Sequence, residues 1–204
     1  MKIRILFALT LAGLAAACGS VAGPSPEPTV EIRAEATAEA TAVDPSWVVV
    51  RLNDPTIPGW EYQHPEGWEV VTLDGRNFFL YSRPGVGEHL FTTPLQPGEI
   101  AFQISLNVVA NAEETATSHL AALTGTLRDT SFSEAQPVSI SGMDGVKQTG
   151  THATLGWTVT AISREFVRGQ YIDIFAYSRT DELDLNLPTI DKVIETVSYA
   201  LPTE

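Results

Sequence analysis

The chain has 204 residues, of which 44% are hydrophobic, and its 12 Lys and Arg against 25 Asp and Glu give a formal net charge of −13. This hydrophobic fraction is enough for a packed core, which excludes a chain that is disordered throughout. The excess of acids argues against nucleic acid as a partner, because phosphate contacts need clustered Lys and Arg.

The first seventeen residues have the pattern of an export signal. Lys2 and Arg4 supply positive charge, and residues 5–17 are apolar or small at every position except Thr10. That order is typical of the n-region and h-region of a secretory signal peptide. As a helix the apolar stretch would extend about 20 Å, which is short of the roughly 30 Å hydrocarbon core of a bilayer. We therefore predict residues 1–17 as a signal peptide and not as a permanent membrane span.

Residues 14–20, Leu-Ala-Ala-Ala-Cys-Gly-Ser, resemble a bacterial lipobox, in which small residues precede a cysteine that is lipidated. The lipobox pattern prefers Leu three residues before the cysteine, whereas Ala15 stands there and Leu14 lies one step earlier. Cys18 is the only cysteine, so it cannot form a disulfide within the chain. The resemblance implies a lipid anchor on Cys18 that holds the protein on the outer side of the cell membrane. The alternative is an ordinary signal peptide with an incidental cysteine.

A tether is predicted after the anchor. Residues 19–44 are rich in Pro, Ser, Thr, Ala and Glu, contain no aromatic residue, and hold five acids against the single Arg33. Such a composition cannot bury enough apolar surface to offset the entropy of ordering. We expect residues 18–44 to be a lipidated, disordered spacer and residues 45–204 to form one domain.

Strand patterns dominate the predicted domain. Residues 100–109 alternate, with Ile100, Phe102, Ile104, Leu106 and Val108 on one face and polar residues on the other, which predicts an antiparallel strand covered on one face. Further strands are predicted at 47–50 and around three turns: 68–73 and 77–82 about Asp74-Gly75, 138–140 and 146–151 about residues 142–145, and 157–167 and 170–177 about Arg168-Gly169. We expect the last of these hairpins at the centre of the sheet.

Two helices are predicted among the strands. Asn111 and Glu114 resemble a capping box before an apolar stripe of Ala116, Leu120, Leu123 and Leu127. The second helix is expected to hold Pro188 in its first turn, with an apolar stripe of Leu187, Ile190, Ile194 and Val197. Because each helix has one apolar face, each should lie on the sheet. The predicted fold class is α+β, an antiparallel β-sheet packed by helices.

Residues 62–68, Tyr-Gln-His-Pro-Glu-Gly-Trp, resemble the Tyr-x-x-Pro-x-Gly-Trp opening of PsbP-like domains. These domains are the extrinsic proteins of photosystem II and their non-photosynthetic bacterial relatives. Residues 190–199 resemble the ending of the family, and the likeness extends over about residues 47–201. It implies an α/β/α sandwich that acts as an accessory or binding module, because the family supplies no shared catalytic residues. A photosystem role does not transfer, since nothing in this chain indicates photosynthesis.

The residues of this motif have two interpretations. In the architectural one, Pro65 fixes φ, Gly67 permits a tight turn, and Trp68 packs at the base of the sheet. In the functional one, Tyr62, His64 and Trp68 belong to a ligand-binding surface. We favour the architectural interpretation.

The loop at residues 83–98 is predicted as the recognition surface. Long loops on rigid scaffolds often carry function, and this loop is punctuated by Pro and Gly. Its candidate polar contacts are Arg83, Glu88 and His89, and its apolar residues are Leu90, Phe91 and Leu95. The apolar residues should either fold back on the core or contact a partner, for which we expect an envelope protein complex.

Motifs for catalysis and cofactor binding are missing from the sequence. It contains no phosphate-binding glycine loop, no dinucleotide fingerprint and no nucleophile elbow. The four histidines, His64, His89, His119 and His152, lack the short spacing that is usual for metal ligands. We therefore expect no metal or cofactor, and we expect His119 to be a boundary residue of its helix.

Asp173 is the most informative acid of the sequence. Alternation places it on the same face of a strand as Tyr171, Phe175 and Tyr177. A carboxylate among three aromatic side chains would be desolvated, which would raise its pKa. The interpretation that we favour pairs Asp173 with Arg164 or Arg179, or turns it to solvent.

An enzyme is the second functional hypothesis. It would be an envelope hydrolase in which His64 or His152 forms a pair with Asp173. This hypothesis requires the two side chains to meet within hydrogen-bond distance in one pocket.

Overall fold

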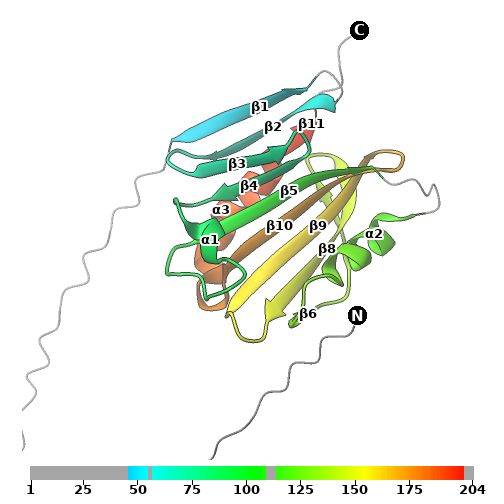
Figure 1. Ribbon diagram of the computed structural model, residues 1–204. Helices are drawn as coiled ribbons and strands as arrows, with labels where there is room; N and C mark the ends of the chain where they lie inside the picture. Colours follow the sequence, from blue (N-terminus) through cyan, green and yellow to red (C-terminus); the bar gives the residue numbers. More distant parts are fainter. Residues whose placement is uncertain (1–45, 55–56, 109–113, 200–204) are drawn as a thin grey trace, which may run out of the picture. The chain divides into compact units, whose positions relative to one another are not determined.

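The computed structural model describes residues 46–54, 57–108 and 114–199, all within one compact unit (Figure 1). Its strands are β1 (Trp47–Asp54), β2 (Ile57–Pro65), β3 (Glu69–Asp74), β4 (Asn77–Tyr81), β5 (Ile100–Val108), β6 (Thr130–Phe132), β7 (Gln136–Ile140), β8 (Met143–His152), β9 (Trp157–Val167), β10 (Gln170–Arg179) and β11 (Ser198–Tyr199). Its helices are α1 (Val86–His89), α2 (Ala116–Thr124) and α3 (Leu183–Thr196), and α3 follows a 3₁₀ turn, η1 (Thr180–Glu182).

The strands form a large antiparallel sheet and a small one. The large sheet has eight strands in the order β3-β4-β5-β10-β9-β8-β6, with β7 pairing to β8 outside that path. The small sheet has the order β1-β2-β11. The hairpin of β9 and β10 lies in the middle of the large sheet, as predicted from its two long apolar runs.

Alternation along β10 separates two cores. Ile172, Ile174 and Ala176 face a core that contains the apolar stripe of α3 and two residues of β2, Trp60 and Tyr62. The intervening residues of β10 face a second core, to which α1 and α2 contribute. Helices therefore cover both faces of the large sheet (Figure 1), and the predicted α+β class with its α/β/α layers is confirmed.

The strand β5 is more buried than its pattern predicted. Ile100, Phe102 and Ile104 are buried on the expected face, but Ala101 and Ser105 are buried on the other face as well. The expectation of one covered face was wrong, because the second core lies against the polar side of the pattern.

The helix α2 begins later than predicted. Its N-cap is Thr115, whose side chain accepts a hydrogen bond from the Ser118 amide, while the Ser118 hydroxyl accepts one from the Thr115 amide. This reciprocal pair is the capping box, so the expected box of Asn111 and Glu114 was wrong. Asn111 lies outside the described residues, and the Glu114 carboxylate binds His119 instead.

The helix α3 begins earlier than predicted. It starts at Leu183, so Pro188 lies inside the helix and not in its first turn. Proline at this position cannot donate to the carbonyl of Asp184, but both residues are exposed and water can hydrate that carbonyl. The predicted apolar stripe is confirmed, since Ile190, Ile194 and Val197 are buried.

The turn between β7 and β8 is also displaced from its predicted place. Ser141 and Gly142 both have positive φ, 52° and 75°, as two-residue hairpin turns with primed geometry require. Asp144 and Gly145 are therefore strand residues that pair with β7, and the expected turn at residues 142–145 was wrong.

Candidate functional site

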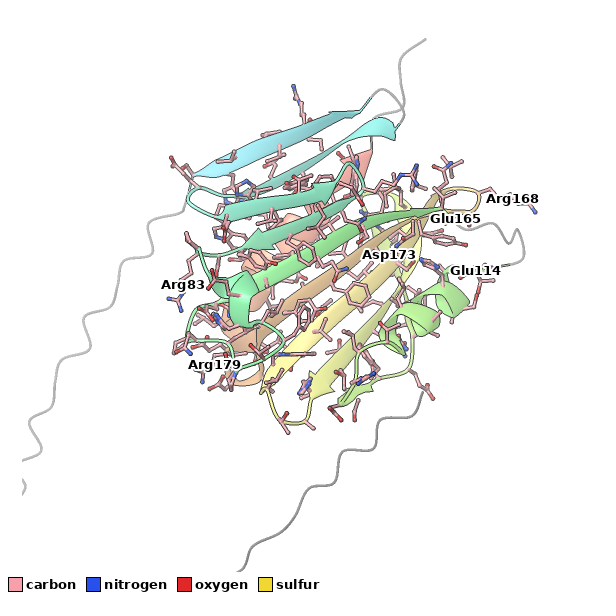
Figure 2. All side chains as sticks on the ribbon, in the orientation of Figure 1. Arg83, Glu114, Glu165, Arg168, Asp173 and Arg179 are labelled. Carbon is pink, nitrogen blue, oxygen red and sulfur yellow. The ribbon has the colours of Figure 1, made fainter. Side chains whose placement is uncertain are left out.

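Polar side chains gather at two opposite ends of the large sheet (Figure 2). Asp173 and Glu114 lie near the turn between β9 and β10, which we call the hairpin end. Arg83 and Arg179 lie at the other end, where residues 83–98 connect β4 to β5, which we call the loop end. The two ends differ in how open they are, and each holds part of the predicted site.

Asp173 is the buried centre of the hairpin end. It is fully buried on β10, in register with Ser105 of β5 and Ser163 of β9. Its Oδ2 accepts hydrogen bonds from Asn107 Nδ2 at 2.7 Å and from His119 Nε2 at 2.9 Å. Asp173 thus binds a histidine and an amide across two elements.

The predicted pairing of Asp173 with an arginine was wrong. Arg164 lies opposite Ile172 in the register, so it faces the core of α3. Arg179 is at the end of β10 and its side chain pairs with Asp181. The expected turn toward solvent was wrong as well, because Asp173 is enclosed beneath α2.

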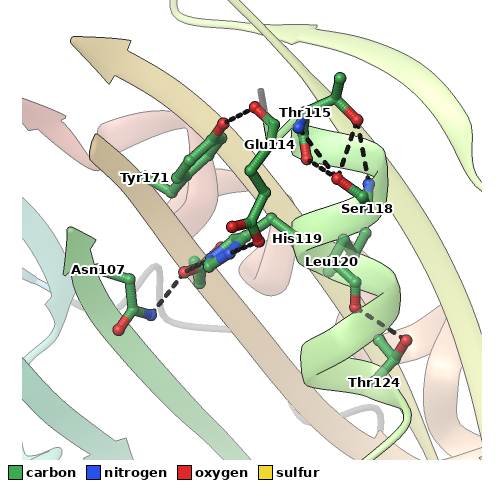
Figure 3. Close-up of polar contacts among 9 residues, drawn as sticks. Asn107, Glu114, Thr115, Ser118, His119, Leu120, Thr124 and Tyr171 are labelled. Atoms are coloured by element: carbon green, nitrogen blue, oxygen red, sulfur yellow. Dashed lines mark hydrogen bonds and ion pairs between the residues drawn. The ribbon is translucent and has the colours of Figure 1, made fainter. Parts of the chain in front are cut away.

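His119 connects two carboxylates (Figure 3). Its Nδ1 lies 3.0 Å from Glu114 Oε1 and its Nε2 lies 2.9 Å from Asp173 Oδ2. The ring stacks on Tyr171 with centroids 4.5 Å apart, and the Tyr171 hydroxyl donates to the Glu114 carbonyl. Both carboxylates are satisfied together only by the doubly protonated ring, because neutral imidazole has a single N–H.

The electrostatics of His119 agree with this geometry. The hydrogen bond to Asp173 raises the pKa of His119 above its ordinary value, although burial opposes the shift, and Glu114 raises it further. The contacts therefore favour the imidazolium. Sequence reasoning treated His119 as a boundary residue, since nothing local shows that this helical position lies above Asp173.

The hairpin end lacks the arrangement of a nucleophile and its base among the described residues. Ser163 is buried beside Asp173 in the register, and neither its hydroxyl nor Asp173 Oδ1 has a hydrogen-bond partner among these residues. A general base needs a free ring nitrogen that contacts the nucleophile, and both nitrogens of His119 are engaged. The contacts of this cluster fasten α2 to the sheet.

The histidines proposed for a hydrolase do not bind Asp173. His64 lies on β2 in the small sheet, where its Nδ1 is 2.8 Å from the Pro65 carbonyl. His152 lies at the end of β8, and its Nδ1 accepts from the amides of Thr154 and Leu155. The structure thus brings His119 to Asp173, and it places His64 and His152 elsewhere.

The motif residues Tyr62, His64 and Trp68 lie in or against the core of α3. Tyr62 and His64 are buried, and burial raises the pKa of Tyr62 to about 12. Trp68 is half-buried and its ring centroid lies 6.0 Å from that of Phe102. Gly67 has a φ of 83°, which suits the turn between β2 and β3. These contacts support the architectural interpretation of the motif.

At the loop end, a carboxylate that sequence reasoning missed holds two of the predicted residues. Glu99 is 2% exposed and accepts from Arg83 at 2.8 and 3.0 Å, from the Gln96 amide at 2.5 Å, and contacts His89 Nε2 at 2.9 Å. Burial opposes ionisation, but these hydrogen bonds outweigh it and hold the pKa of Glu99 below its usual range. Glu99, the residue that follows the loop, therefore fastens the loop to the sheet through these contacts.

The apolar residues of the loop divide between core and surface. Leu90 and Leu95 are buried in the second core. For these two residues the first of the two expectations, that the loop folds back on the core, is confirmed. Phe91 is 50% exposed and packs edge-on against Tyr177, with centroids 5.6 Å apart. The loop thus keeps one aromatic side chain at the surface of a fastened segment.

Two hollows flank this loop. One has a cavity volume of about 410 Å³ and is lined by Pro94, Leu95, Leu155, Gly156, Arg179, Thr180 and Asp181. The other, which we call the tyrosine hollow, has a volume of about 260 Å³ and is lined by Glu69, Val71, Tyr81, Gly85, Gly87 and Glu88. The predicted residue Glu88 therefore lines a hollow. Arg83 and His89 instead bind the Glu99 carboxylate and so hold the loop in place.

Two features are absent from the described residues. They contain no group of three or more His, Cys, Asp or Glu side chains arranged to hold a metal ion. In the same part of the chain, no helix is long and apolar enough to cross a membrane. Cys18 and the predicted tether lie outside the described residues.

No protein-family model and no curated protein sequence matches the chain. Its structure resembles the solution structure of the cyanobacterial PsbP (CyanoP) from Synechocystis sp. PCC 6803, with a TM-score of 0.51 and 12% identity over 81% of this chain and 99% of that one. It is also similar to LpqN of Mycobacterium tuberculosis, a protein involved in cell envelope biogenesis, with a TM-score of 0.49 and 14% identity over 78% and 94% of the two chains. The likeness to CyanoP confirms the predicted PsbP-like fold, and at this identity it shows the fold alone.

Proposed function

We propose that the protein is an extracytoplasmic binding module, tethered to the membrane by a lipid on Cys18, that recognises a partner through residues 83–98. The observation that carries the proposal is the loop end. The loop is fastened to the buried carboxylate of Glu99, yet it lines two hollows and exposes Phe91. A surface that is ordered before binding loses little conformational entropy on association, which favours affinity.

The proposed anchor rests on the sequence. A charged n-region, an apolar h-region and small residues before the single Cys18 form one continuous pattern. The described domain begins near Trp47, which leaves residues 19–45 between the proposed anchor and the first strand. This interval is long enough for the domain to reach a neighbouring complex in the same membrane.

Binding is favoured over catalysis by the state of the buried histidine. His119 is the histidine that meets Asp173, and both of its ring nitrogens are already occupied by carboxylates. Neither of the two hollows at the loop end is lined by either residue. A hydrolase would need a free histidine nitrogen next to a nucleophile in an open pocket.

The recognition surface is tested by photo-crosslinking in cells. A photoreactive phenylalanine analogue at Phe91 is expected to capture one reproducible envelope protein. The matched control carries the same analogue at Val167, which is 41% exposed at the end of β9, at the hairpin end of the sheet. Equal capture by both positions, or none at Phe91, would contradict the proposed surface.

The anchor is tested by Cys18→Ala in the full chain. The variant is expected to leave the membrane fraction, and the wild-type chain to stay in it until its lipid is removed. Unchanged membrane retention of the variant would show that Cys18 does not carry the anchor.

A further inference from the structure

The tyrosine hollow is built from two strands and the recognition loop. Glu69 of β3 lies opposite Tyr81 of β4 in the register, and Glu88 belongs to α1 within the loop. Val71, two residues after Glu69, adds an apolar wall. Strand pairing on one side and the loop on the other thus place two carboxylates and one phenol around a single hollow.

Tyr81 contributes a hydroxyl group that is free within the described part of the chain. The residue is only 8% exposed, it lines the hollow, and its hydroxyl makes no hydrogen bond with a described residue. A Cβ atom on Gly87 would lie 2.7 Å from the phenolic oxygen and 2.6 Å from the ring. Glycine at this position therefore lets the ring and hydroxyl of Tyr81 pack directly against the backbone of α1.

The polar groups of the hollow are rich in acceptors. Glu69 and Glu88 form no ion pair with any described residue, and an ionised carboxylate can only accept hydrogen bonds. The phenolic oxygen of Tyr81 can accept one more. A ligand that matches such a site carries positive charge and several N–H donors, and the primary ammonium group has three. The net charge of −13 adds a long-range attraction for cations.

The size of the hollow limits what enters it. Its volume of about 260 Å³ is below the roughly 300–1,000 Å³ that is typical of pockets for drug-sized ligands. It suits a single side chain or a short amine. A divalent metal ion is less suited, because the described residues around the hollow offer two carboxylates and no third metal-binding side chain.

We infer that the tyrosine hollow binds a primary alkylammonium group, presented by a lysine side chain of the partner or by a free alkylamine. The inference deepens the proposed function and rests on it, because the recognition loop forms one wall of the hollow. The carboxylates of Glu69 and Glu88 and the Tyr81 oxygen each accept one N–H.

The inference is tested by NMR titration of the ¹⁵N-labelled full chain carrying Cys18→Ala. n-Butylammonium is expected to shift the amide signals of Gly85 and Gly87 in a saturable manner. n-Butanol, which lacks the charge, and tetramethylammonium, which lacks N–H donors, are expected to leave them in place. Equal shifts with tetramethylammonium, or shifts with Ca²⁺ in place of the amine, would overturn the ammonium assignment.

A second pair of probes distinguishes the two sources of the ammonium. Nα-acetyl-lysine methylamide is compared with its norleucine analogue, which has the same stem without the charge. Tighter binding of the lysine derivative than of n-butylammonium assigns a protein side chain, and the reverse order assigns a free amine.

Variants locate the site and separate its failure from that of the proposed function. Glu88→Gln and Tyr81→Phe are expected to weaken n-butylammonium binding at least tenfold, while Glu134→Gln, an exposed acid elsewhere, leaves it unchanged. Equal affinity of Glu88→Gln and wild type would overturn the inference. Partner capture at Phe91 without amine binding removes only this inference, whereas amine binding without capture supports it and contradicts the proposed recognition surface.

Discussion

Two buried cations lie on opposite faces of the central hairpin, and the protein stabilises them differently. His119 lies between the carboxylates of Glu114 and Asp173. Arg164 is fully buried and has no carboxylate partner among the described residues; its Nη1 donates to the Ile140 carbonyl at 3.1 Å and its Nη2 to the Val197 carbonyl at 2.9 Å. One cation is stabilised by ionised side chains and the other by the backbone.

The end of α3 explains how Arg164 is tolerated. Val197 is the C-cap of that helix, where unpaired carbonyls carry the negative end of the helix dipole. Burial lowers the pKa of Arg164 to about 10, which still leaves it charged at neutral pH. Gly145 gives room for the side chain, because a Cβ there would lie 2.7 Å from Arg164 Cγ.

The two arrangements differ in how the charge of the buried cation responds to pH. A cation between carboxylates, such as His119, changes its charge with pH, and its contacts weaken when it loses its proton. A guanidinium bound to carbonyls keeps its charge throughout the physiological range. We therefore expect the attachment of α2 to weaken as the pH rises and the attachment of α3 to be insensitive to pH in the physiological range.

The largest expected effect follows loss of the permanent cation. Arg164→Ala removes the hydrogen bonds to two carbonyls and opens a cavity, and we expect the free energy of unfolding to fall by about 3–5 kcal/mol. Urea unfolding at pH 7 measures it. Arg168→Ala, an exposed arginine in the adjacent turn, is the control and should change stability by less than about 0.5 kcal/mol. A loss below about 1 kcal/mol for Arg164→Ala would contradict the role given to its two carbonyl contacts.

A smaller loss is expected on the other face. Asp173→Asn removes one of two carboxylates, but His119 can relieve the imbalance by losing its proton, so we expect a loss of about 1–3 kcal/mol. The pKa of His119, followed by NMR, should fall toward its ordinary value. Asp144→Asn, at an exposed position on β8, is the control. An unchanged His119 pKa in Asp173→Asn would refute the bridge between the two carboxylates.

The helix that carries His119 gives the next effect in size. Thr115→Ala removes the N-cap hydroxyl of α2 and should lower stability by about 1 kcal/mol. Thr117→Ala, two residues on at an exposed position inside the helix, should be neutral or slightly stabilising because alanine favours helix. Thermal unfolding of the two variants distinguishes a capping effect from a general loss of threonine.

The smallest expected effect is a change of slope with pH. Because the pKa of His119 is raised in the folded state, the stability that it contributes is full below its unfolded pKa of about 6.5 and is lost as pH rises through the folded pKa. The stability difference between wild type and His119→Gln should therefore shrink as the pH rises above about 6.5. The difference between wild type and Arg164→Ala should stay constant there, since arginine remains protonated. Parallel pH profiles for the two pairs would refute the distinction between the two cations.

The layers of the fold and the face of the strand on which Asp173 lies could both be predicted from the sequence. Period-two alternation places Asp173 with Tyr171 and Phe175, and that assignment is confirmed. Its partner could not be predicted, because His119 is 54 residues away and only the docking of α2 brings it there. Glu99 was missed for the same reason, since its burial depends on how the loop folds back.

The helix start shows how a local signal can mislead. Asn111 with Glu114 and Thr115 with Ser118 are both acceptable capping patterns. The choice between them depends on tertiary contacts, since the helix begins after Glu114 and the Glu114 carboxylate contacts His119. The position of the loop at 83–98 between two strands was predicted correctly, since its glycines and prolines reflect geometry that the chain needs locally.

The order of strands in the large sheet has a consequence for how the protein is made. β5 lies between β4 and β10, and its pairing with β10 joins residues as far apart as Ile100 and Ser178. Contacts between such distant residues form slowly, because a long loop must close before they contribute. Because the chain is synthesised from the N-terminus, β5 is made before β10. It has one open edge and an apolar face until residues 170–179 follow. Any delay before these residues arrive would therefore leave a strand available for pairing with another copy, which favours aggregation during synthesis.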